Sequence, residues 1–240
     1  GDVAGMGADL YESSCGSILS TMALGASAFY AVGPEMQMKA ILAPMMIAAI
    51  GVVLSIIGIY AVRTKEGAGL MQLLKSLSVG TNLSACLIAL VTFGVFYVLG
   101  FPNWWQLSLS VISGLLAGVI IGKATEYYTS HSYKPTQKLA ESSQTGPATI
   151  IIKGIGLGMV STCIPVVTIV VAILLSYLFA TGFTFDPSKI SFGLYGISIA
   201  AVGMLSTLGI TLATDAYGPI ADNAGGNAQM SELDPEVRPR

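Results

Sequence analysis

Charged side chains are scarce in this 240-residue chain, and that scarcity excludes most soluble architectures. Only 10% of the residues are Asp, Glu, Lys or Arg, whereas 53% are hydrophobic and the mean hydropathy is +0.75. Soluble domains carry about 25% charged residues. The 11 basic residues are scattered along a chain of net charge −2, so no concentrated positive surface is available for DNA or RNA. The composition predicts a membrane protein without a nucleic-acid partner.

Histidine and cysteine are also rare, and the commonest phosphate-binding loop is missing. His131 has no second imidazole with which to form a zinc site or a Ser-His-Asp triad. Cys15, Cys86 and Cys163 lie far apart in apolar stretches without a CxxC pair, so we interpret them as packing residues. The sequence contains no GxxxxGK(S/T) motif, which excludes a P-loop ATPase segment. Metal-assisted hydrolysis on carboxylates is the catalytic chemistry that stays open.

Long apolar runs fill most of the chain instead. A bilayer core of about 30 Å needs about 20 mostly apolar residues in each helix. A soluble βαβ protein, the alternative, would need polar helix faces, and these runs are apolar all round. We therefore predict an all-α fold, a polytopic transmembrane helix bundle that forms one domain over residues 1–240. Its six predicted spans are 10–32, 42–62, 84–101, 107–124, 150–180 and 190–213.

Glycines recur at four-residue spacing inside two of these spans. Gly114, Gly118 and Gly122 share one face of the fourth span, and Gly154 and Gly158 share one face of the fifth. Small residues at this spacing let membrane helices approach closely. We expect both faces to be helix contacts.

Lysine and arginine are distributed unevenly among the connections, and this predicts the orientation. Short cytoplasmic loops retain an excess of positive residues. The second and fourth connections carry most of them: Arg63, Lys65, Lys75, Lys123, Lys134, Lys138 and Lys153. The alternate connections carry Lys39 and Lys189, and Trp104 and Trp105 then fall at the outer interface. Six crossings also place both chain ends in the cytoplasm.

Three carboxylates lie at the cytoplasmic mouth of the first span. Asp2 and Asp9 are two helical turns apart and Glu12 is one turn further along, so the three share a broad helix face. A carboxylate inside a membrane helix usually faces a cavity and serves an ion pathway. The alternative is a helix end that projects into water.

Asp215 and Asp222 repeat the seven-residue spacing after the sixth span. They are followed by a glycine-rich stretch that begins at Asn223. Oxygen ligands of this kind suit Mg²⁺, which keeps several waters and bridges to substrate phosphates. Turn chemistry explains the same residues equally well. The segment is either a metal site or a polar turn.

Three segments resemble the signatures of one family, the membrane-bound ion-translocating pyrophosphatases. The first is GDVAGMGADLYES at 1–13, the second comprises EYYTS at 126–130 with AESSQTG at 140–146, and the third is DAYGPIADNAGG at 215–226. They occur in the family's order. The family forms homodimers of subunits with about sixteen transmembrane helices, and the six spans here would correspond to its sixth to eleventh. The resemblance therefore implies an internal fragment.

The resemblance also implies an activity. The intact protein would hydrolyse Mg²⁺-bound pyrophosphate at the cytoplasmic side of the cell inner membrane and export Na⁺ or H⁺. Asp2 matches a residue that positions the attacking water and binds metal, and Asp222 with Asn223 matches the Mg²⁺-pyrophosphate shell. Asp9 and Glu12 match the ion gate, in an arrangement that resembles sodium-transporting members more than plant-type proton pumps. K⁺ dependence stays open, because the segment that decides it would follow residue 240.

A secondary transporter or channel segment is the rival interpretation, in which intramembrane carboxylates bind ions without hydrolysis. Inverted internal repeats would favour it, and the sequence shows none. The chain opens without an initiator Met, closes on a polar connector, and lacks the family's upstream and downstream acidic and lysine-bearing motifs. We therefore expect the chain alone to be inactive.

Overall fold

Helices are the only regular secondary structure in the described part of the chain. A computed structural model describes residues 1–65, 67 and 69–232, and these residues form α-helices and short 3-10 helices without a strand. The all-α prediction is confirmed. Most of the predicted polar connector, residues 233–240, lies outside the described residues. The elements are α1 (Asp2–Ala28), α2 (Pro34–Ala61), α3 (Leu70–Val98), α4 (Trp104–Thr129), α5 (Lys134–Glu141), η1 (Ser142–Thr145), α6 (Pro147–Ser161), α7 (Cys163–Thr181), η2 (Pro187–Lys189), α8 (Ile190–Leu205) and α9 (Leu208–Met230).

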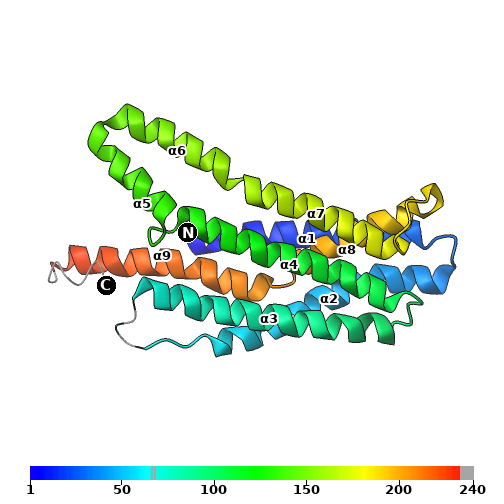
Figure 1. Cartoon of the computed structure of the whole chain (residues 1–240). Helices are drawn as coiled ribbons and strands as arrows, with labels where there is room; N and C mark the ends of the chain where they lie inside the picture. The colour runs from blue at the N-terminus through cyan, green and yellow to red at the C-terminus, as the bar shows by residue number, and fades with distance from the viewer. Residues whose placement is uncertain (66, 68, 233–240) are drawn as a thin grey trace.

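The long helices run up and down one bundle, which gives it two distinct ends. The start of α1, the end of α9, the α2–α3 connection and the α4–α5 turn lie at one end (Figure 1). We call this the acidic end, because Asp2, Glu126 and Asp222 belong to it. The α1–α2, α3–α4 and α7–η2 connections lie at the other, which we call the aromatic end (Figure 1). This alternation agrees with the arrangement of connections that the sequence predicts.

The number of spans needs one correction. By length and composition, α1 does not qualify as a membrane span, because Asp9, Glu12 and several serines interrupt its apolar residues. The multi-pass bundle is confirmed, but five helical segments of the described chain meet the criterion rather than six. They are Pro34–Ala61, Met71–Val98, Trp104–Thr145, Pro147–Thr181 and Pro187–Leu205.

Two spans predicted as continuous helices are interrupted. Residues 150–180 are divided at Thr162, between α6 and α7, where Pro165 lacks an amide hydrogen and its ring crowds the carbonyl of Ser161. The sixth predicted span is divided between α8 and α9. There the backbone N–H and the hydroxyl of Ser206 both donate to the carbonyl of Gly203, at 3.1 and 2.6 Å. These bonds tighten the last turn of α8 and end the helix.

The sequence predicts that the glycine-rich segment after the sixth span lies beyond the last helix, and that prediction is wrong. Asp215, Asp222 and Asn223 all lie inside α9, which continues to Met230 with Pro219 in its interior. Alanine, glutamine and methionine are good helix formers, and they are frequent enough in this stretch to extend the helix through its glycines.

The tightest packing lies at the aromatic end. Phe29 makes edge-on ring contacts with Phe101, Phe192 and Tyr195, at centroid distances of 5.6, 5.1 and 5.4 Å. The Tyr195 hydroxyl is buried and donates to the carbonyl of Ala40 at 3.0 Å. Exposed aromatic side chains surround this core, as expected at a membrane interface. They are Tyr30, Tyr97, Trp105, Phe183 and Phe185.

The closest approach between helices joins α4 to α8. A methyl group on Gly114 would overlap the backbone carbonyl of Ala200, and one on Gly203 would overlap the carbonyl of Val111. Neither helix could come so near its neighbour with a side chain at these positions. Two backbones in contact gain van der Waals attraction along their length.

The predicted glycine contacts are therefore confirmed in part. Gly118 follows Gly114 on the same face of α4, and a methyl there would lie 3.2 Å from Met204 of α8. A methyl added to Gly122 or Gly158 would meet no heavy atom within 4 Å among the described residues, so the contact expected at these two positions is not made within this part of the protein. Glycine spacing marked the right face of α4 but not how far the contact extends.

We expect Gly114→Ala to destabilise the full-length protein by about 1–3 kcal/mol, because overpacking separates α4 from α8. Gly122→Ala is the matched control on the same helix and should be neutral or stabilising by up to about 1 kcal/mol, since alanine favours the helix. The measurement is the temperature at which half of the detergent-solubilised protein has lost its folded elution peak. Equal midpoints for the two variants would contradict the close contact.

Candidate functional site

The first acidic segment occupies the opening turns of α1. The helix begins at Asp2, where a carboxylate interacts favourably with the helix dipole. An α-helix rises 1.5 Å per residue, so Asp9 lies about 10 Å along the axis from Asp2, and Glu12 lies one turn further. All three residues are exposed in the described part of the chain. The helix thus carries three carboxylates spaced from its N-terminal end towards its middle.

The second acidic segment lies on α9. Asp215 and Asp222 are two turns apart and therefore share a helix face. Asp215 is half-buried, whereas Asp222 and Asn223 are exposed. Burial raises the pKa of the Asp215 carboxyl above its ordinary value, because a charged carboxylate is less well solvated there.

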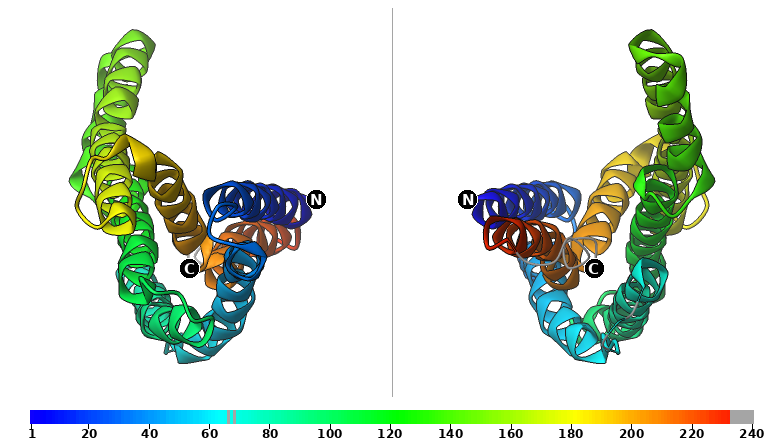
Figure 2. Two further views of the ribbon diagram at one scale, coloured as in Figure 1. Left: turned by 90° about the vertical axis from the view of Figure 1, so that its right-hand side faces the viewer. Right: turned by 90° about the vertical axis from the view of Figure 1, so that its left-hand side faces the viewer.

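Packing of α1 against α9 brings the two segments together. The helices lie side by side in both views of Figure 2. Gly7 of α1 faces Leu212 of α9, and a methyl on Gly7 would lie 3.6 Å from the Leu212 Cδ1 atom. These residues lie between Asp2 and Asp9 on α1 and just before Asp215 on α9. Two helices that carry carboxylates more than 200 positions apart in sequence therefore pack together at the acidic end.

The carboxylates do not form a closed metal site by themselves. No group of three His, Cys, Asp or Glu side chains among the described residues is arranged to hold a metal ion. Mg²⁺ needs no such cage, because it usually binds through one or two carboxylates, several waters and substrate phosphates. The exposed, hard oxygen ligands Asp2 and Asp222 fit a Mg²⁺ ion of this kind.

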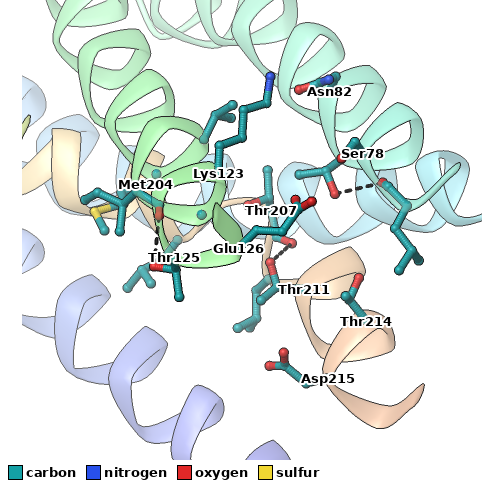
Figure 3. Close-up of a pocket in the computed structure, with 18 of the residues that line it drawn as sticks. Ser78, Asn82, Lys123, Thr125, Glu126, Met204, Thr207, Thr211, Thr214 and Asp215 are labelled. Carbon is teal, nitrogen blue, oxygen red and sulfur yellow. Dashed lines mark hydrogen bonds between the residues drawn. The ribbon is translucent and has the colours of Figure 1, made fainter. Parts of the chain in front are cut away.

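A cavity of about 480 Å³ opens beside this site, between α3, α4 and α9 (Figure 3). Leu10 is the residue of α1 that lines it. Its exposed lining surface is mostly apolar, although ten of its twenty lining residues are polar or charged. The polar and charged lining residues are Ser78, Thr81, Asn82, Lys123, Thr125, Glu126, Thr207, Thr211, Thr214 and Asp215.

The cavity lining differs from the set of residues predicted from the sequence. Asp2, Asp9, Glu12, Asp222 and Asn223 lie outside it. The sequence marks Asp215 by its spacing from Asp222 and as the start of the third signature, Glu126 as the start of the EYYTS segment, and Lys123 as part of a connection. Their seven-residue and three-residue spacings fit a helix face, yet nothing local in the sequence indicates that α4 and α9 share a cavity.

A much smaller cavity, about 20 Å³, lies deeper along α1. It is bordered by Ser14 and Ser17 of α1 and by Ser206 at the break between α8 and α9. A volume of this size accommodates one water molecule when polar partners are present. Ser14 and Ser17 lie on a different side of α1 from Glu12, because successive residues of an α-helix are about 100° apart. The cavity therefore faces α2 and α8.

Comparisons with known proteins extend over the whole chain. The family model described as "Inorganic H+ pyrophosphatase" matches residues 1–240. The chain is 65% identical to the putative K(+)-stimulated pyrophosphate-energized sodium pump of Bacteroides thetaiotaomicron, over 99% of the chain and 32% of that protein. It is 42% identical to the K(+)-insensitive pyrophosphate-energized proton pump of Methanosarcina mazei, over 98% of the chain and 33% of that protein.

A further similarity is 39% identity to the K(+)-stimulated pyrophosphate-energized sodium pump of Thermotoga maritima, over 97% of the chain and 33% of that protein. The chain spans about a third of the length of the curated relatives it matches. The similarities therefore include proteins named for either ion.

The α1–α9 contact can be tested by cross-linking in the full-length protein. With the native cysteines replaced, we expect Gly7→Cys and Leu212→Cys to be joined by a short bifunctional thiol reagent, because the two positions face each other. Cleavage at a protease site placed in the α2–α3 connection should then leave one linked band on a denaturing gel. The control pair is Gly16→Cys with Leu212→Cys, since Gly16 has open space around it. Equal linkage of both pairs would contradict the packing.

Proposed function

This chain belongs to the inorganic H+ pyrophosphatase family, and we propose that it forms part of a membrane pump that hydrolyses pyrophosphate and exports Na⁺. The 65% identical relative is named as a pyrophosphate-energized sodium pump, which supports this choice of ion. Because the chain spans about a third of that relative's length, the activity is proposed for the whole protein. The chain alone is proposed to be inactive.

The proposed pump is a multi-pass protein of the cell inner membrane with its acidic end in the cytoplasm. Residues 1–240 are one part of a single transmembrane domain, and the whole protein is a homodimer. The excess of lysine and arginine at the acidic end supports the orientation. The least buried span, Pro147–Thr181, leaves an apolar surface for lipid or a second subunit.

One observation carries the proposal: α1 packs against α9, so two acidic segments from opposite ends of the chain meet at one end of the bundle. Hydrolysis of pyrophosphate needs little covalent chemistry from a protein. It needs oxygen ligands for Mg²⁺, a carboxylate to accept a proton from water, and positions held by rigid elements. Two adjoining helices that both carry carboxylates can supply all three.

The proposed hydrolytic residues are Asp2, Asp222 and Asn223. Asp2 orients the attacking water and accepts its proton, and it shares with Asp222 the ligation of Mg²⁺. When bound, Mg²⁺ would neutralise charge on the phosphate groups and so favour departure of the leaving phosphate. The Asn223 amide on α9 is proposed to donate a hydrogen bond to a phosphate oxygen. K⁺ stimulation is proposed by analogy with the relatives' names.

Asp9 and Glu12 are proposed as the ion gate. A pair of carboxylates one helical turn apart can hold a dehydrated cation whose charge offsets the cost of burying both groups. The small cavity bordered by Ser14, Ser17 and Ser206 lies beyond Glu12 along α1, on the side that faces α2 and α8. Because Asp2, Asp9 and Glu12 share one rigid helix, a change of charge at Asp2 during hydrolysis would be felt about 10 Å away at the gate.

The hydrolytic assignment predicts that Asp2→Asn and Asp222→Asn in the full-length protein each lower phosphate release from Mg²⁺-pyrophosphate at least a hundredfold, roughly the contribution of a general base. The control is Asp186→Asn at the aromatic end, where asparagine can still accept the bond from the Ser188 backbone N–H. Its activity should match that of the parent. Near-normal phosphate release by Asp2→Asn or Asp222→Asn would defeat the assignment.

The gate assignment makes a separate prediction. Glu12→Ala should abolish most pyrophosphate-driven ²²Na⁺ uptake into inverted vesicles while leaving the KM for pyrophosphate within about twofold, because the substrate site uses other residues. Glu35→Ala is the control, since Glu35 pairs with Lys39 at the aromatic end. Acidification without sodium uptake by the parent protein would contradict sodium export and leave the hydrolytic proposal intact.

A further inference from the structure

A second cavity joins the large one at the acidic end. Its volume is about 320 Å³, and it lies between the start of α3 and the end of α4. The two cavities share Leu74, Ser78, Lys123 and Glu126 in their walls, so they form one continuous space. We call this space the α3–α4 groove. Each of its two parts has the volume of an ordinary small-molecule site, roughly 300–1,000 Å³.

The chemistry of the groove changes along its length. The outer part carries two lysines and two tyrosines: Lys75, Lys123, Tyr127 and Tyr133. The inner part is mainly aliphatic. Its apolar walls come from five helices, α1, α3, α4, α8 and α9: Leu10, Leu74, Leu77, Val119, Ile121, Met204, Leu205 and Leu208. A molecule that fits this groove has an anionic head and an apolar tail.

The acidic groups in the groove do not neutralise its lysines. Glu126 accepts a hydrogen bond from the Tyr133 hydroxyl at 3.0 Å, which holds its carboxylate towards α5. Asp215 lies in the inner part, on α9. Neither Lys75 nor Lys123 has a carboxylate within ion-pair distance among the residues that the structure describes. Two ammonium groups from different helices therefore remain available at the mouth.

Further positive charge borders the mouth. The Ser76 hydroxyl donates to the backbone carbonyl of Arg63 at 2.8 Å, so the start of the α2–α3 connection lies beside the first turns of α3. Lys134 begins α5 directly after Tyr133. Anionic lipids concentrate in the cytoplasmic leaflet and attract basic residues at this depth, and basic pockets between transmembrane helices bind their headgroups.

We propose that the α3–α4 groove binds one anionic phospholipid of the cytoplasmic leaflet. Its phosphate lies between Lys75 and Lys123, the tyrosine hydroxyls lie beside the headgroup, and one acyl chain enters the apolar inner part. The occupant shares its phosphate chemistry with free phosphate, but free phosphate would leave the aliphatic walls uncovered. This site is separate from the hydrolytic residues and depends only on the membrane setting.

Occupancy of the groove would also affect α9. Leu208, Thr211 and Asp215 form its wall on that side, and Asp222 lies two turns further along the same helix. A chain packed against this wall would restrain α9 relative to α4. Bound lipid is therefore expected to stabilise the protein and to raise its pyrophosphate-hydrolysing activity.

The test uses the full-length protein, delipidated and titrated with phosphatidylglycerol in phosphatidylcholine nanodiscs or detergent micelles. Native mass spectrometry counts retained lipid, and thermal unfolding reports its effect. The double variant Lys75→Gln/Lys123→Gln should bind phosphatidylglycerol roughly tenfold to thirtyfold more weakly, given the attraction expected from two basic residues. Lys138→Gln/Lys153→Gln is the control, because it removes the same charge from exposed positions outside the groove.

A second variant keeps the charges and fills the inner groove. Gly122 lines the cavity, and a methyl added there would meet no atom within 4 Å, so Gly122→Phe has room to fold. It should also lose the retained phosphatidylglycerol, although both lysines remain. Two results together would overturn the proposal in favour of a free anion site. They are displacement of the lipid by millimolar inorganic phosphate, and phosphatidylglycerol retention by Gly122→Phe equal to that of the parent. Equal lipid retention by the parent and by Lys75→Gln/Lys123→Gln would overturn it as well.

Discussion

The contact between the backbones of α4 and α8 is the constraint on which the rest of the bundle depends. In a bilayer the surrounding lipid is as apolar as the helices, so association relies on close packing and on hydrogen bonds between helices. Gly114 and Gly203 allow this close approach because they have no side chain that would overlap the backbone carbonyls of Ala200 and Val111. With α4 and α8 fixed, α7 joins α4 through a hydrogen bond from the Ser110 hydroxyl to the Ser176 carbonyl at 3.0 Å. The helix α8 then becomes the central element against which α1 and α7 pack.

Packing is dense at the aromatic end of the bundle and open at the acidic end. Aromatic rings close the end that holds Phe29 and Tyr195, whereas the acidic end opens into two joined cavities. The Thr21 hydroxyl donates to the carbonyls of Ser17 and Ser198, which ties the middle of α1 to α8. Beyond that tie, α1 contacts α9 instead. The half closed by aromatic rings thus supports a half that opens into the α3–α4 groove.

The break between α8 and α9 lets α9 run in its own direction after α8. Ser206 and Thr207 end one helix and begin the next without a proline. Gly51 of α2 fits against the Ser206 carbonyl, so the break is packed on one side and borders the small serine-lined cavity on the other. Beyond it, α9 forms a wall of the α3–α4 groove and also carries Asp222. One helix therefore joins the proposed lipid site to the proposed hydrolytic residues, and it packs against the helix that carries Asp9 and Glu12.

Composition and apolar periodicity determined that this chain is an all-α membrane bundle, because the cost of placing a polar backbone or charged side chains in lipid acts on every residue locally. The same local reasoning singled out Asp2, Asp9, Glu12 and Asp222 as candidate site residues, and it identified the glycine face of α4. It could not divide the last span at Ser206 or extend α9 past Asp222, since those outcomes depend on neighbouring helices. Only the tertiary structure decided that α1 meets α9 and that Lys75 and Lys123 share a groove. Such contacts depend on how side chains of helices distant in sequence interdigitate, and no short stretch of sequence encodes that fit.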